Sequence, residues 1–497
     1  MLHGLEVRRA SGSLTGEILS LCYDSRRAAP GCLFFALPGA RTDGNRFARE
    51  AIEKGAAAVM SELPQPPAPL IAARRGPGAS GVIWIEVENV LEAMSRAAAL
   101  FYERPSRRLT LLGVTGTNGK TTTTYLLESI LARSGASAGV IGTVDYRLRG
   151  RPVEKASNTT PLSADLQRLL SQMRARGATH VAMEVSSHAL SLHRVDDVDF
   201  DVAIFTNLHR DHLDYHKTPE RYFEAKARLF DLLCRVDTAK KRRAAVLNAD
   251  DPKTEPIKRR VVDADVVTYG FDASADVRGL SCHVGLEGTS LRLRHRTGEW
   301  LAHLKLIGRF NAANALAAAA AMLWLGHEPR KIIEGLEALS HIPGRLEPVK
   351  IRGNFRVFVD YAHTDSALRL VLENVRTLPH RRVLTVFGCG GDRDKTKRGP
   401  MGAAACDLSD LAILTSDNPR TEDPRAILYQ IEEGIKSAGR QNYKIVPDRR
   451  EAIAEAIRQA REGDIVLIAG KGHETYQILK DRTIAFDDRE VVREILR

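Results

Sequence analysis

The sequence lacks the patterns that mark secreted, zinc-binding and membrane-spanning proteins. None of its six cysteines forms a Cys-x-x-Cys pair, so reduced thiols fit better than a disulfide framework or a zinc site. The longest apolar run, residues 315–325, is well short of the about 20 residues that span a bilayer, and its alanines favour a buried helix. No basic segment leads into an apolar stretch near residue 1. We therefore expect a cytoplasmic protein with no membrane partner.

Fixed-period repeats and low-complexity tracts are also missing, which argues against solenoid and linker proteins. The chain has 497 residues, more than one hydrophobic core usually serves, and its 43% apolar and 27% charged content is ordinary for a globular enzyme. Two or four domains are alternatives, but breaks in the pattern favour three. We place them at residues 1–104, 105–341 and 342–497.

The formal charge of +11 suits either a nucleic acid or a small polyanion such as a nucleotide. The basic clusters at residues 240–243 and 258–260 contain none of the aromatic residues that stack on bases, so we interpret them as solvent-exposed surface. We expect no nucleic-acid partner.

Short apolar runs alternate with helical stretches along most of the chain. This alternation indicates an α/β protein, and in the central domain it predicts a P-loop-type, doubly wound, mostly parallel sheet. The first domain reads as a small α/β unit and the third as a Rossmann-like α/β domain. The expected strands of the second and third domains are residues 109–114, 138–144, 180–185, 202–206, 244–248, 357–361, 382–388, 411–415 and 464–469.

A glycine-rich segment, Gly116-Thr117-Asn118-Gly119-Lys120-Thr121, lies between an expected strand and an expected helix. Glycines let backbone N–H groups approach phosphate, the lysine holds the terminal phosphates, and the hydroxyl after it can ligate magnesium. The strict P-loop spacing needs glycine at position 114, where this chain has valine. The segment predicts nucleotide binding without naming the reaction.

Two polar clusters follow later strands. Glu184 ends one strand and is a candidate Mg²⁺ ligand, although an ordinary strand end would look the same. Residues 207–216 hold three histidines and two aspartates, and there His212 with His216 could bind zinc. We favour Mg²⁺, with His212 as a nitrogen ligand, because a triphosphate site suits hard oxygen ligands. Lys226, in a helical stretch, is by default a surface lysine.

Three loops of the third domain carry charged groups suited to an amino acid. Residues 387–395 form a glycine-rich loop around Arg393. In the next loop, Arg420 can grip a carboxylate bidentately while Asp417 and Asn418 face an ammonium group. Glu474 lies in a third loop and offers a carboxylate to a second amine, although a helix-capping turn would look similar.

Together these motifs resemble those of the Mur ligases of peptidoglycan synthesis, relatives of folylpolyglutamate synthetase. The resemblance implies an ATP-dependent ligase that phosphorylates a carboxylate and lets an amine displace the phosphate. It runs from about residue 20 to the C-terminus, and its markers, besides the loops around Arg393 and Arg420, are residues 24–26, 116–121, 158–161, 184–188, 207–214, 311–314, 343–345 and 360–363.

The resemblance also implies binding residues. For the substrate UDP-N-acetylmuramoyl-L-alanyl-D-glutamate they are Ser25, Ala40, Arg41, Thr42, Asn158, Thr159, Thr160, Ser186 and Arg194. For ATP they are Thr115, Gly116, Thr117, Asn118, Gly119, Lys120, Thr121, Asn311, Arg345 and Asp360. For the amino acid, which the Asp-Asn-Pro-Arg form indicates is meso-2,6-diaminopimelate, they are Arg393, Asp417, Asn418, Pro419, Arg420, Gly470 and Glu474.

For the chemistry itself, the resemblance implies that Lys120, Lys226 and His212 are catalytic and that Mg²⁺ is held by Thr121, Glu184, His212 and Lys226. Lys226 falls where family members carry an N6-carboxylated lysine, whose carbamate can ligate a second Mg²⁺. Leu192 and the turn at residues 40–42 depart from the pattern of some members. The alternatives are a sister ligase that uses lysine or folate, and a nucleic-acid-dependent NTPase. We expect a monomer.

Overall fold

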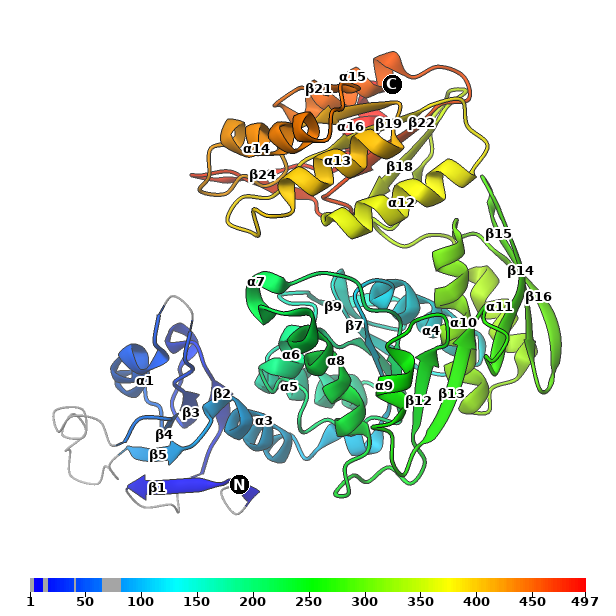
Figure 1. Ribbon diagram of the computed structural model, residues 1–497. Coiled ribbons are helices and arrows are strands. Elements are labelled where there is room, and N and C mark those ends of the chain that lie inside the picture. Colours follow the sequence, from blue (N-terminus) through cyan, green and yellow to red (C-terminus); the bar gives the residue numbers. More distant parts are fainter. Residues whose placement is uncertain (1–3, 12–16, 40–41, 65–81) are drawn as a thin grey trace.

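The structure, a computed structural model, describes residues 4–11, 17–39, 42–64 and 82–497. Three α/β bodies follow one another along the chain, each built on its own sheet (Figure 1). The predicted α/β class is therefore confirmed. The third body lies above the other two in Figure 1. The first body contacts the central one mainly through a long helix, α3, which packs on α5, and Tyr23 adds a hydrogen bond to Asp165.

The first body is a five-stranded sheet with the order β1-β5-β4-β3-β2. All its neighbouring strands are parallel except β1 and β5. Asn89 caps α3 by accepting hydrogen bonds from two backbone N–H groups, and this explains why the helix begins there. The elements are β1 (Val7–Ser11), β2 (Ser20–Cys22), β3 (Cys32–Phe35), α1 (Ala48–Glu53), β4 (Ala58–Ser61), β5 (Ile83–Val87) and α3 (Val90–Phe101).

The central body has an eleven-stranded sheet. Its middle is parallel, as predicted, with β6 (Thr110–Thr115) between β10 (His180–Glu184) and β11 (Val202–Phe205). Further parallel strands on the two sides are β7 (Ala138–Ile141), β12 (Ala244–Asn248) and β13 (Asp265–Gly270).

Both ends of the central sheet carry antiparallel strands that the pattern analysis missed. β8 (Asp145–Leu148) and β9 (Arg151–Lys155) extend one edge, and a meander of β14 (Val277–Gly285), β15 (Gly288–His295) and β16 (Gly298–Leu304) extends the other. The turns of the meander use glycines with positive φ, at Gly288 and Gly298. In β15, the alternation of apolar and charged residues in Leu291-Arg292-Leu293-Arg294 is the sequence signal that could have found this strand.

Helices cover both faces of the central sheet. α4 (Lys120–Arg133), α10 (Arg309–Trp324) and α11 (Pro329–Ala338) share one core cluster, and α5 (Ser163–Ala175) and α8 (Pro219–Leu233) share the other. The alanine-rich segment predicted as a buried helix lies in α10, and its alanines from Ala315 to Ala321 are fully buried. Three short helices, α6 (Ser187–Ser191), α7 (Leu213–His216) and α9 (Thr254–Lys258), complete the body.

The third body is a six-stranded sheet with the order β17-β18-β22-β19-β20-β21, parallel except at β17. The strands are β17 (Glu347–Val349), β18 (Arg356–Asp360), β19 (Val383–Phe387), β20 (Leu411–Leu414), β21 (Tyr443–Ile445) and β22 (Ile465–Ala469), and a separate hairpin is formed by β23 (Tyr476–Ile478) and β24 (Thr483–Ala485). The helices are α12 (Asp365–Thr377), α13 (Arg398–Leu408), α14 (Pro424–Ser437), α15 (Arg449–Gln459) and α16 (Asp488–Ile495).

The meander joins the central body to the third. Val284 and Leu286, at the turn between β14 and β15, pack against the third body's core, and Glu287 pairs with Arg356 at 2.9 Å. The meander strands lie below the third body on the right of Figure 1. The missed strands therefore form part of the support on which the third body rests.

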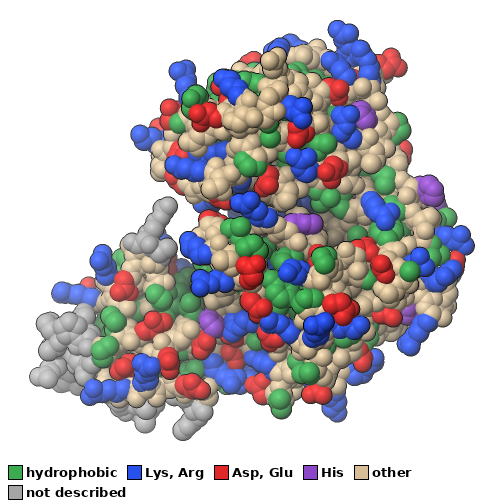
Figure 2. All heavy atoms as spheres, in the orientation of Figure 1, with side chains coloured by type: hydrophobic (Ala, Val, Ile, Leu, Met, Phe, Trp, Pro, Cys, Tyr) green, Lys and Arg blue, Asp and Glu red, His purple; other side chains and the backbone are tan. Residues whose placement is uncertain are grey.

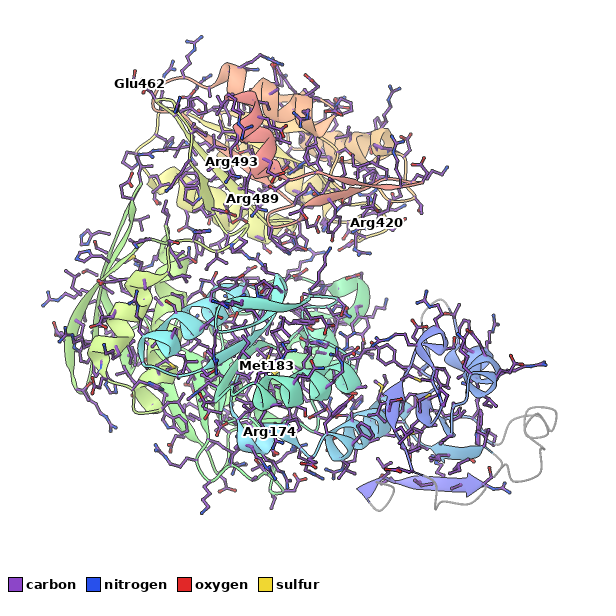
Figure 3. All side chains as sticks on the ribbon, turned by 180° about the vertical axis from the view of Figure 1, so that it is seen from behind. Arg174, Met183, Arg420, Glu462, Arg489 and Arg493 are labelled. Carbon is purple, nitrogen blue, oxygen red and sulfur yellow. The ribbon has the colours of Figure 1, made fainter. Side chains whose placement is uncertain are left out.

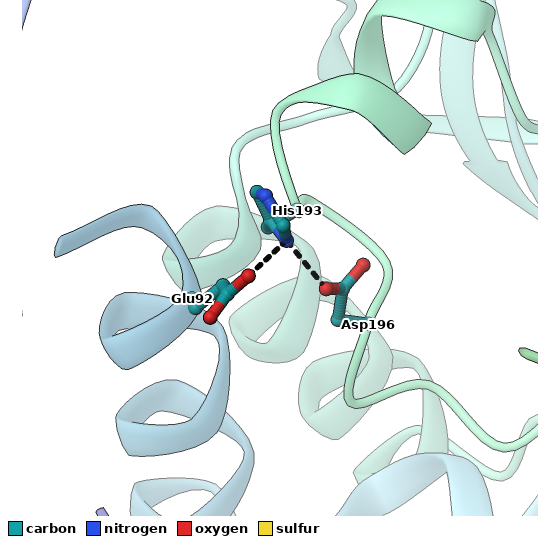
Figure 4. A group of neighbouring side chains, drawn as sticks. All are labelled: Glu92, His193 and Asp196. Atoms are coloured by element: carbon teal, nitrogen blue, oxygen red, sulfur yellow. Dashed lines mark hydrogen bonds and ion pairs between the residues drawn. The ribbon is translucent and has the colours of Figure 1, made fainter. Parts of the chain in front are cut away.

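An ion-pair group joins the first and central bodies (Figure 4). His193 Nδ1 lies 3.1 Å from a Glu92 oxygen and 2.7 Å from an Asp196 oxygen. A histidine between two carboxylates is a pattern that metals use, but Arg228 Nη2 already lies 2.5 Å from the same Asp196 oxygen. A metal ion would have to displace that guanidinium, so we interpret the group as an interdomain contact.

The surface interpretation of the basic cluster at residues 240–243 is wrong in part. Lys240 is paired with Asp201 at 2.7 Å and only 8% of its side chain is exposed. Arg243 donates to the carbonyl oxygens of Leu233 and Arg235. These two cations hold the edge of the central body together.

In the described part of the chain, no helix is both long and apolar enough to cross a membrane.

Candidate active site

A cavity of about 300 Å³ lies between the central and third bodies. Figure 2 shows the surface hollowed between the third body above and the other two below. Eleven of the predicted site residues line the cavity, and they come from both bodies: Thr117, Asn118, Gly119, Lys120, Thr121, Thr159, Glu184, Ser186, His212, Arg345 and Asp360.

The loop between β6 and α4 has the geometry of a phosphate-binding loop. Gly116 has φ +144° and Gly119 has φ +89°, values that side chains rarely adopt. A Cβ at either position would also overlap a polar side chain, that of Thr206 or Asn314. The loop therefore needs glycine twice, and the N-terminus of α4 faces the cavity with its partial positive charge.

Lys120 is folded over this loop. Its Nζ donates to the carbonyl oxygens of Gly116 and Thr117, at 2.9 Å each, and burial lowers the pKa of its ammonium. An anion in the loop would restore a charged partner to this lysine. Thr115 ends β6 beneath the loop and is fully buried, so it supports the backbone and does not line the cavity.

The Glu184 carboxylate accepts hydrogen bonds from hydroxyl groups that are far apart in the sequence. It is 1% exposed and accepts hydrogen bonds from Thr121 Oγ1 at 3.0 Å, Thr143 Oγ1 at 3.1 Å and Thr143 N at 2.8 Å. Thr143 in turn lies 3.1 Å from Thr159 Oγ1. A carboxylate among hydroxyls is a set of hard oxygen donors, and the chemistry of this set fits Mg²⁺. Sequence reasoning missed Thr143.

Lys226 is not a surface residue, so the default interpretation is wrong. It is 1% exposed on α8, and its Nζ donates to Gly116 O at 2.8 Å. Burial, followed by the charge of Lys120, lowers its pKa well below the ordinary value. The Nζ also lies 4.5 Å from the centre of the Tyr222 ring. The spacing of residues along α8 could not predict the burial of Lys226, because the atoms that contact its Nζ belong to the phosphate loop, far away in the sequence.

His212 belongs to an aromatic cluster at the start of α7. Its ring lies 4.9 Å from that of His188, which in turn contacts the rings of Tyr215 and His216. Burial lowers the pKa of His212 to about 4, so its imidazole is neutral at neutral pH and can act as a ligand. The zinc pair proposed as an alternative is not supported, because His216 Nε2 is bonded to Ser187 Oγ at 2.9 Å.

The residues predicted to hold the muramoyl peptide gather at the end of β10. Thr160 Oγ1 donates to Glu184 O and accepts from Ser186 N. Arg194 donates to Thr160 O at 2.8 Å, and Tyr146 donates to Asn158 O at 2.6 Å. Arg194 is half-buried, and the described groups that interact with its charge are tyrosines, with no carboxylate among them. A cation without a carboxylate partner is a site for an anionic group.

The predicted uridine contacts lie apart from this cavity, in the first body. Ser25 is buried and its Oγ donates to Glu50 at 2.7 Å. Thr42 is exposed. Ala40 and Arg41 lie outside the described residues, so the predicted turn is only partly visible.

Three residues predicted to bind ATP lie across the cavity from the loop or behind it. Arg345 Nη2 donates to Thr121 Oγ1 at 3.1 Å. Asp360 is buried, which raises its pKa, and it accepts from the backbone N–H groups of Leu346 and Ala362. Asn311 is 1% exposed and bonded to Ile307 O, whereas Asn314, one turn along α10, lines the cavity.

The three loops predicted to bind the amino acid meet in the third body. Gly391 N donates to Asn418 O at 2.9 Å, and Arg420 Nη1 donates to Gly391 O at 2.8 Å. Asn418 Nδ2 donates to Glu474 at 2.8 Å, and a Cβ at Gly470 would come within 2.6 Å of Asp417 Oδ2. Pro419 lies within the second loop.

Two predicted arginines bound the opening of these loops. Arg393 is exposed, and it flanks Gly390 together with Arg420. Figure 3 places Arg420 on the edge of the third body that faces the other two. The rings of Tyr361 and His473, 4.8 Å apart, connect the nucleotide cavity to the Glu474 loop, and neither ring was predicted as part of the site.

Family comparison agrees with this geometry. Three family models match consecutive stretches of the chain: the Mur ligase family catalytic domain at residues 17–102, the Mur ligase middle domain at 114–322 and the Mur ligase glutamate ligase domain at 344–472. The chain belongs to the Mur ligase family, a family of ATP-dependent ligases.

Within the family, two relatives carry the name UDP-N-acetylmuramoyl-L-alanyl-D-glutamate–2,6-diaminopimelate ligase. The relative from Solibacter usitatus is 48% identical over 97% of this chain and 94% of its own length. The one from Geobacter metallireducens is 47% identical over 98% and 96%. Both chains are covered almost completely, so the similarity extends to all three bodies.

Solved structures show the same fold. A structure of the ligase of that name is 33% identical, with a TM-score of 0.66 over 96% of this chain and 94% of its own. A MurF ligase from Thermotoga maritima in complex with ADP has a TM-score of 0.63 at 19% identity, over 96% of each chain. At 19% identity, the second match supports the fold alone.

Proposed function

We propose that this chain uses ATP to join meso-2,6-diaminopimelate to UDP-N-acetylmuramoyl-L-alanyl-D-glutamate. The observation that carries the proposal is the position of Lys120 and Arg420 on facing bodies, one on a phosphate-binding loop and one beside a carboxylate-lined loop. The shared name of relatives 46–48% identical to this chain supports the choice of substrates.

The reaction has two steps. The D-glutamate side-chain carboxylate attacks the γ-phosphorus of ATP and ADP leaves, giving an acyl phosphate. An amine of diaminopimelate then attacks the acyl carbon, expels phosphate and loses a proton to form the amide. Lys120 and the backbone N–H groups of the loop would hold the phosphates in line and stabilise the charge that develops on them.

Magnesium fits the oxygen donors around Glu184. Thr121 and Glu184 would hold it, and when bound it would neutralise phosphate charge as a Lewis acid. His212, with a lowered pKa, would offer a neutral nitrogen on the same side of the cavity. Arg194 would hold an anionic group of the muramoyl peptide, with Thr159, Thr160 and Ser186 beside it.

The environment of Lys226 favours carboxylation of its Nζ. The lysine amine adds to CO₂ only when it is neutral, and its lowered pKa increases the neutral fraction. The C–N bond that forms releases one proton and leaves a carbamate. We expect a carbamate resonance in carbon-13 NMR after equilibration with labelled bicarbonate, and its loss in Lys226→Met; equal spectra would remove the proposal.

The domain boundaries at residues 104 and 341 also remain a proposal. Left-handed residues flank both: Glu103 and Arg104 at the first, and Gly344 and Leu346 at the second. Such turns let the chain change direction between sheets. Closure of the third body about the second boundary would bring the amine to the acyl phosphate.

One assay tests the function. Purified protein is given ATP, Mg²⁺ and the UDP-linked dipeptide, and phosphate release is measured with meso-diaminopimelate or lysine. We expect release with diaminopimelate and at least about tenfold less with lysine. Equal phosphate release with the two amino acids would disprove the assignment of diaminopimelate as substrate. Phosphate release that requires nucleic acid and neither of the proposed substrates would disprove the ligase function.

A further inference from the structure

We propose that Lys471 is a positioning residue for the amino-acid substrate, because it holds Asn418 and Glu474 in the orientation that leaves one Glu474 oxygen for a substrate ammonium. Lys471 was not among the residues that the sequence motifs singled out for binding. The inference rests on the proposed function, and it adds to it the group that orders the ammonium site.

Lys471 is a buried cation inside the amino-acid loops. Its side chain is fully buried, and its Nζ lies 3.1 Å from Glu474 Oε2 and 3.2 Å from Asn418 Oδ1. Its backbone lies directly after β22, in the turn that begins at Gly470. The ammonium therefore approaches the site from behind and cannot itself be reached from solvent.

The three side chains form a closed triad. Asn418 Nδ2 donates to Glu474 Oε2 at 2.8 Å, so the same carboxylate oxygen accepts from both Asn418 and Lys471. Asn418 Oδ1 accepts from Lys471 and also from Ile478 N at 2.9 Å. Every polar atom of the Asn418 side chain is thus engaged, and its amide can take only one orientation.

This arrangement changes the expected role of Asn418. The sequence pattern suggested that Asn418 faces an ammonium group, but its only acceptor atom is already bonded to Lys471 and Ile478. Two carboxylate oxygens are left: among the described residues, nothing donates to Glu474 Oε1 or to Asp417 Oδ2. An ammonium in this pocket would therefore be bound by Glu474 and Asp417, with Asn418 as their support.

Lys471 also controls the charge of the pocket. Two carboxylates that face one ammonium repel each other, and a buried cation on the far side of Glu474 reduces this repulsion. Without Lys471, Glu474 Oε2 would keep only the Asn418 bond, and the carboxylate could rotate away from the substrate. The predicted consequence is weaker binding of the amino acid and not of ATP.

The test compares Lys471→Met with wild type in the ligase assay. We expect the KM for diaminopimelate to rise about 10–100-fold while the KM values for ATP and the UDP-linked dipeptide change less than about twofold. Lys471→Gln, which keeps a donor but loses the charge, should give a smaller rise. Lys480→Met, an exposed lysine in the nearby β23–β24 turn, is the matched control and should leave all three KM values unchanged.

A merely structural role would give a different result. It would lower kcat or the melting temperature of Lys471→Met and move all three KM values together, and this outcome would overturn the proposal. A double-mutant cycle with Glu474→Gln adds a second criterion. Since Lys471 acts through Glu474, the two effects on KM should be far from additive, and additive effects would also overturn the proposal.

Failure of the inference differs from failure of the proposed function. If wild-type protein does not use diaminopimelate, the function is wrong and the variants are not needed to show it. If wild type uses diaminopimelate and folded Lys471→Met keeps its KM for that substrate, only the positioning role is wrong. If Lys471→Met does not fold, Lys471→Gln is used in its place. An unchanged KM for diaminopimelate in Lys471→Gln would then show that the positioning role is wrong.

Discussion

Arg345 Nη2 donates a hydrogen bond to Thr121 Oγ1 across the boundary between the third and central bodies, at 3.1 Å. The same hydroxyl donates to Glu184 at 3.0 Å. An arginine from the linker before the third body is thus connected to the phosphate loop and, through one threonine, to the expected metal ligand. This connection couples the position of the third body to the nucleotide site.

Replacement of Arg345 should therefore weaken the use of ATP. For Arg345→Ala we expect kcat/KM for ATP to fall about 10–100-fold, because a charged donor next to the phosphates is lost. Steady-state kinetics with varied ATP measure this. Lys350→Ala, an exposed residue just after β17, is the control; equal kinetics of Arg345→Ala and wild type would contradict the coupling.

Gly119 should not tolerate a side chain, for reasons of both conformation and space. Gly119→Ala is expected to abolish measurable ATP binding, because its Cβ would overlap Asn314 Oδ1. Gly135→Ala is a matched control, since its φ is +77° and nothing lies within 4 Å of the added Cβ. Nucleotide titration separates the two: strain alone would affect both variants, whereas the overlap affects Gly119→Ala only.

Arg420 should decide between diaminopimelate and lysine. The extra carboxylate of diaminopimelate is the group that a guanidinium can hold, so Arg420→Ala should lower kcat/KM for diaminopimelate about 100-fold. Activity with lysine should change little. A competition assay with both amino acids measures the ratio, with exposed Arg425→Ala as the control. An equal loss for both substrates would show that Arg420 acts on the fold.

His216 should make the protein less stable in acid. Burial lowers its pKa to about 4 from an ordinary 6.5, so below pH 6.5 the unfolded chain binds a proton that the folded chain does not. Stability from this group is present above about pH 6.5 and is lost as the pH falls towards 4. Over that pH window, the free energy of unfolding of His216→Gln should fall by about 2 kcal/mol less than that of wild type. Urea unfolding at several pH values measures the difference. His341→Gln, on the surface, should behave as wild type.

The buried pair of Arg449 and Asp488 should be important for stability. Both side chains are fully buried, with Arg449 Nη2 2.7 Å from Asp488. Asp488→Asn leaves the arginine without a counter-charge and should cost about 3–5 kcal/mol in denaturant unfolding. The exposed pair of Arg450 and Glu494, on the same two helices, provides the comparison: Glu494→Gln should cost less than about 1 kcal/mol. Similar costs would show that burial is not the cause.

Much of the fold followed from local patterns. Short apolar runs predicted nine parallel strands of the central and third bodies to within a few residues, because a buried parallel strand is apolar on both faces. Two more parallel strands, β13 and β21, were missed. The meander of β14, β15 and β16 was missed, since its half-exposed strands carry charged residues between the apolar ones. The glycines of the phosphate loop were evident because their conformational requirement is itself local.

The sequence by itself determined the α/β class, the phosphate loop and the family motifs. Only the tertiary structure decided which side chains share a contact. It placed Thr143 among the oxygen donors around Glu184 and buried Lys226 beneath the phosphate loop. It also showed that Lys471 donates to Asn418 Oδ1, the only acceptor atom of that side chain. These partners are separated by tens to more than a hundred residues. Periodicity reports the environment of a residue within its own helix or strand, whereas burial and charge pairing depend on what the rest of the chain places over it.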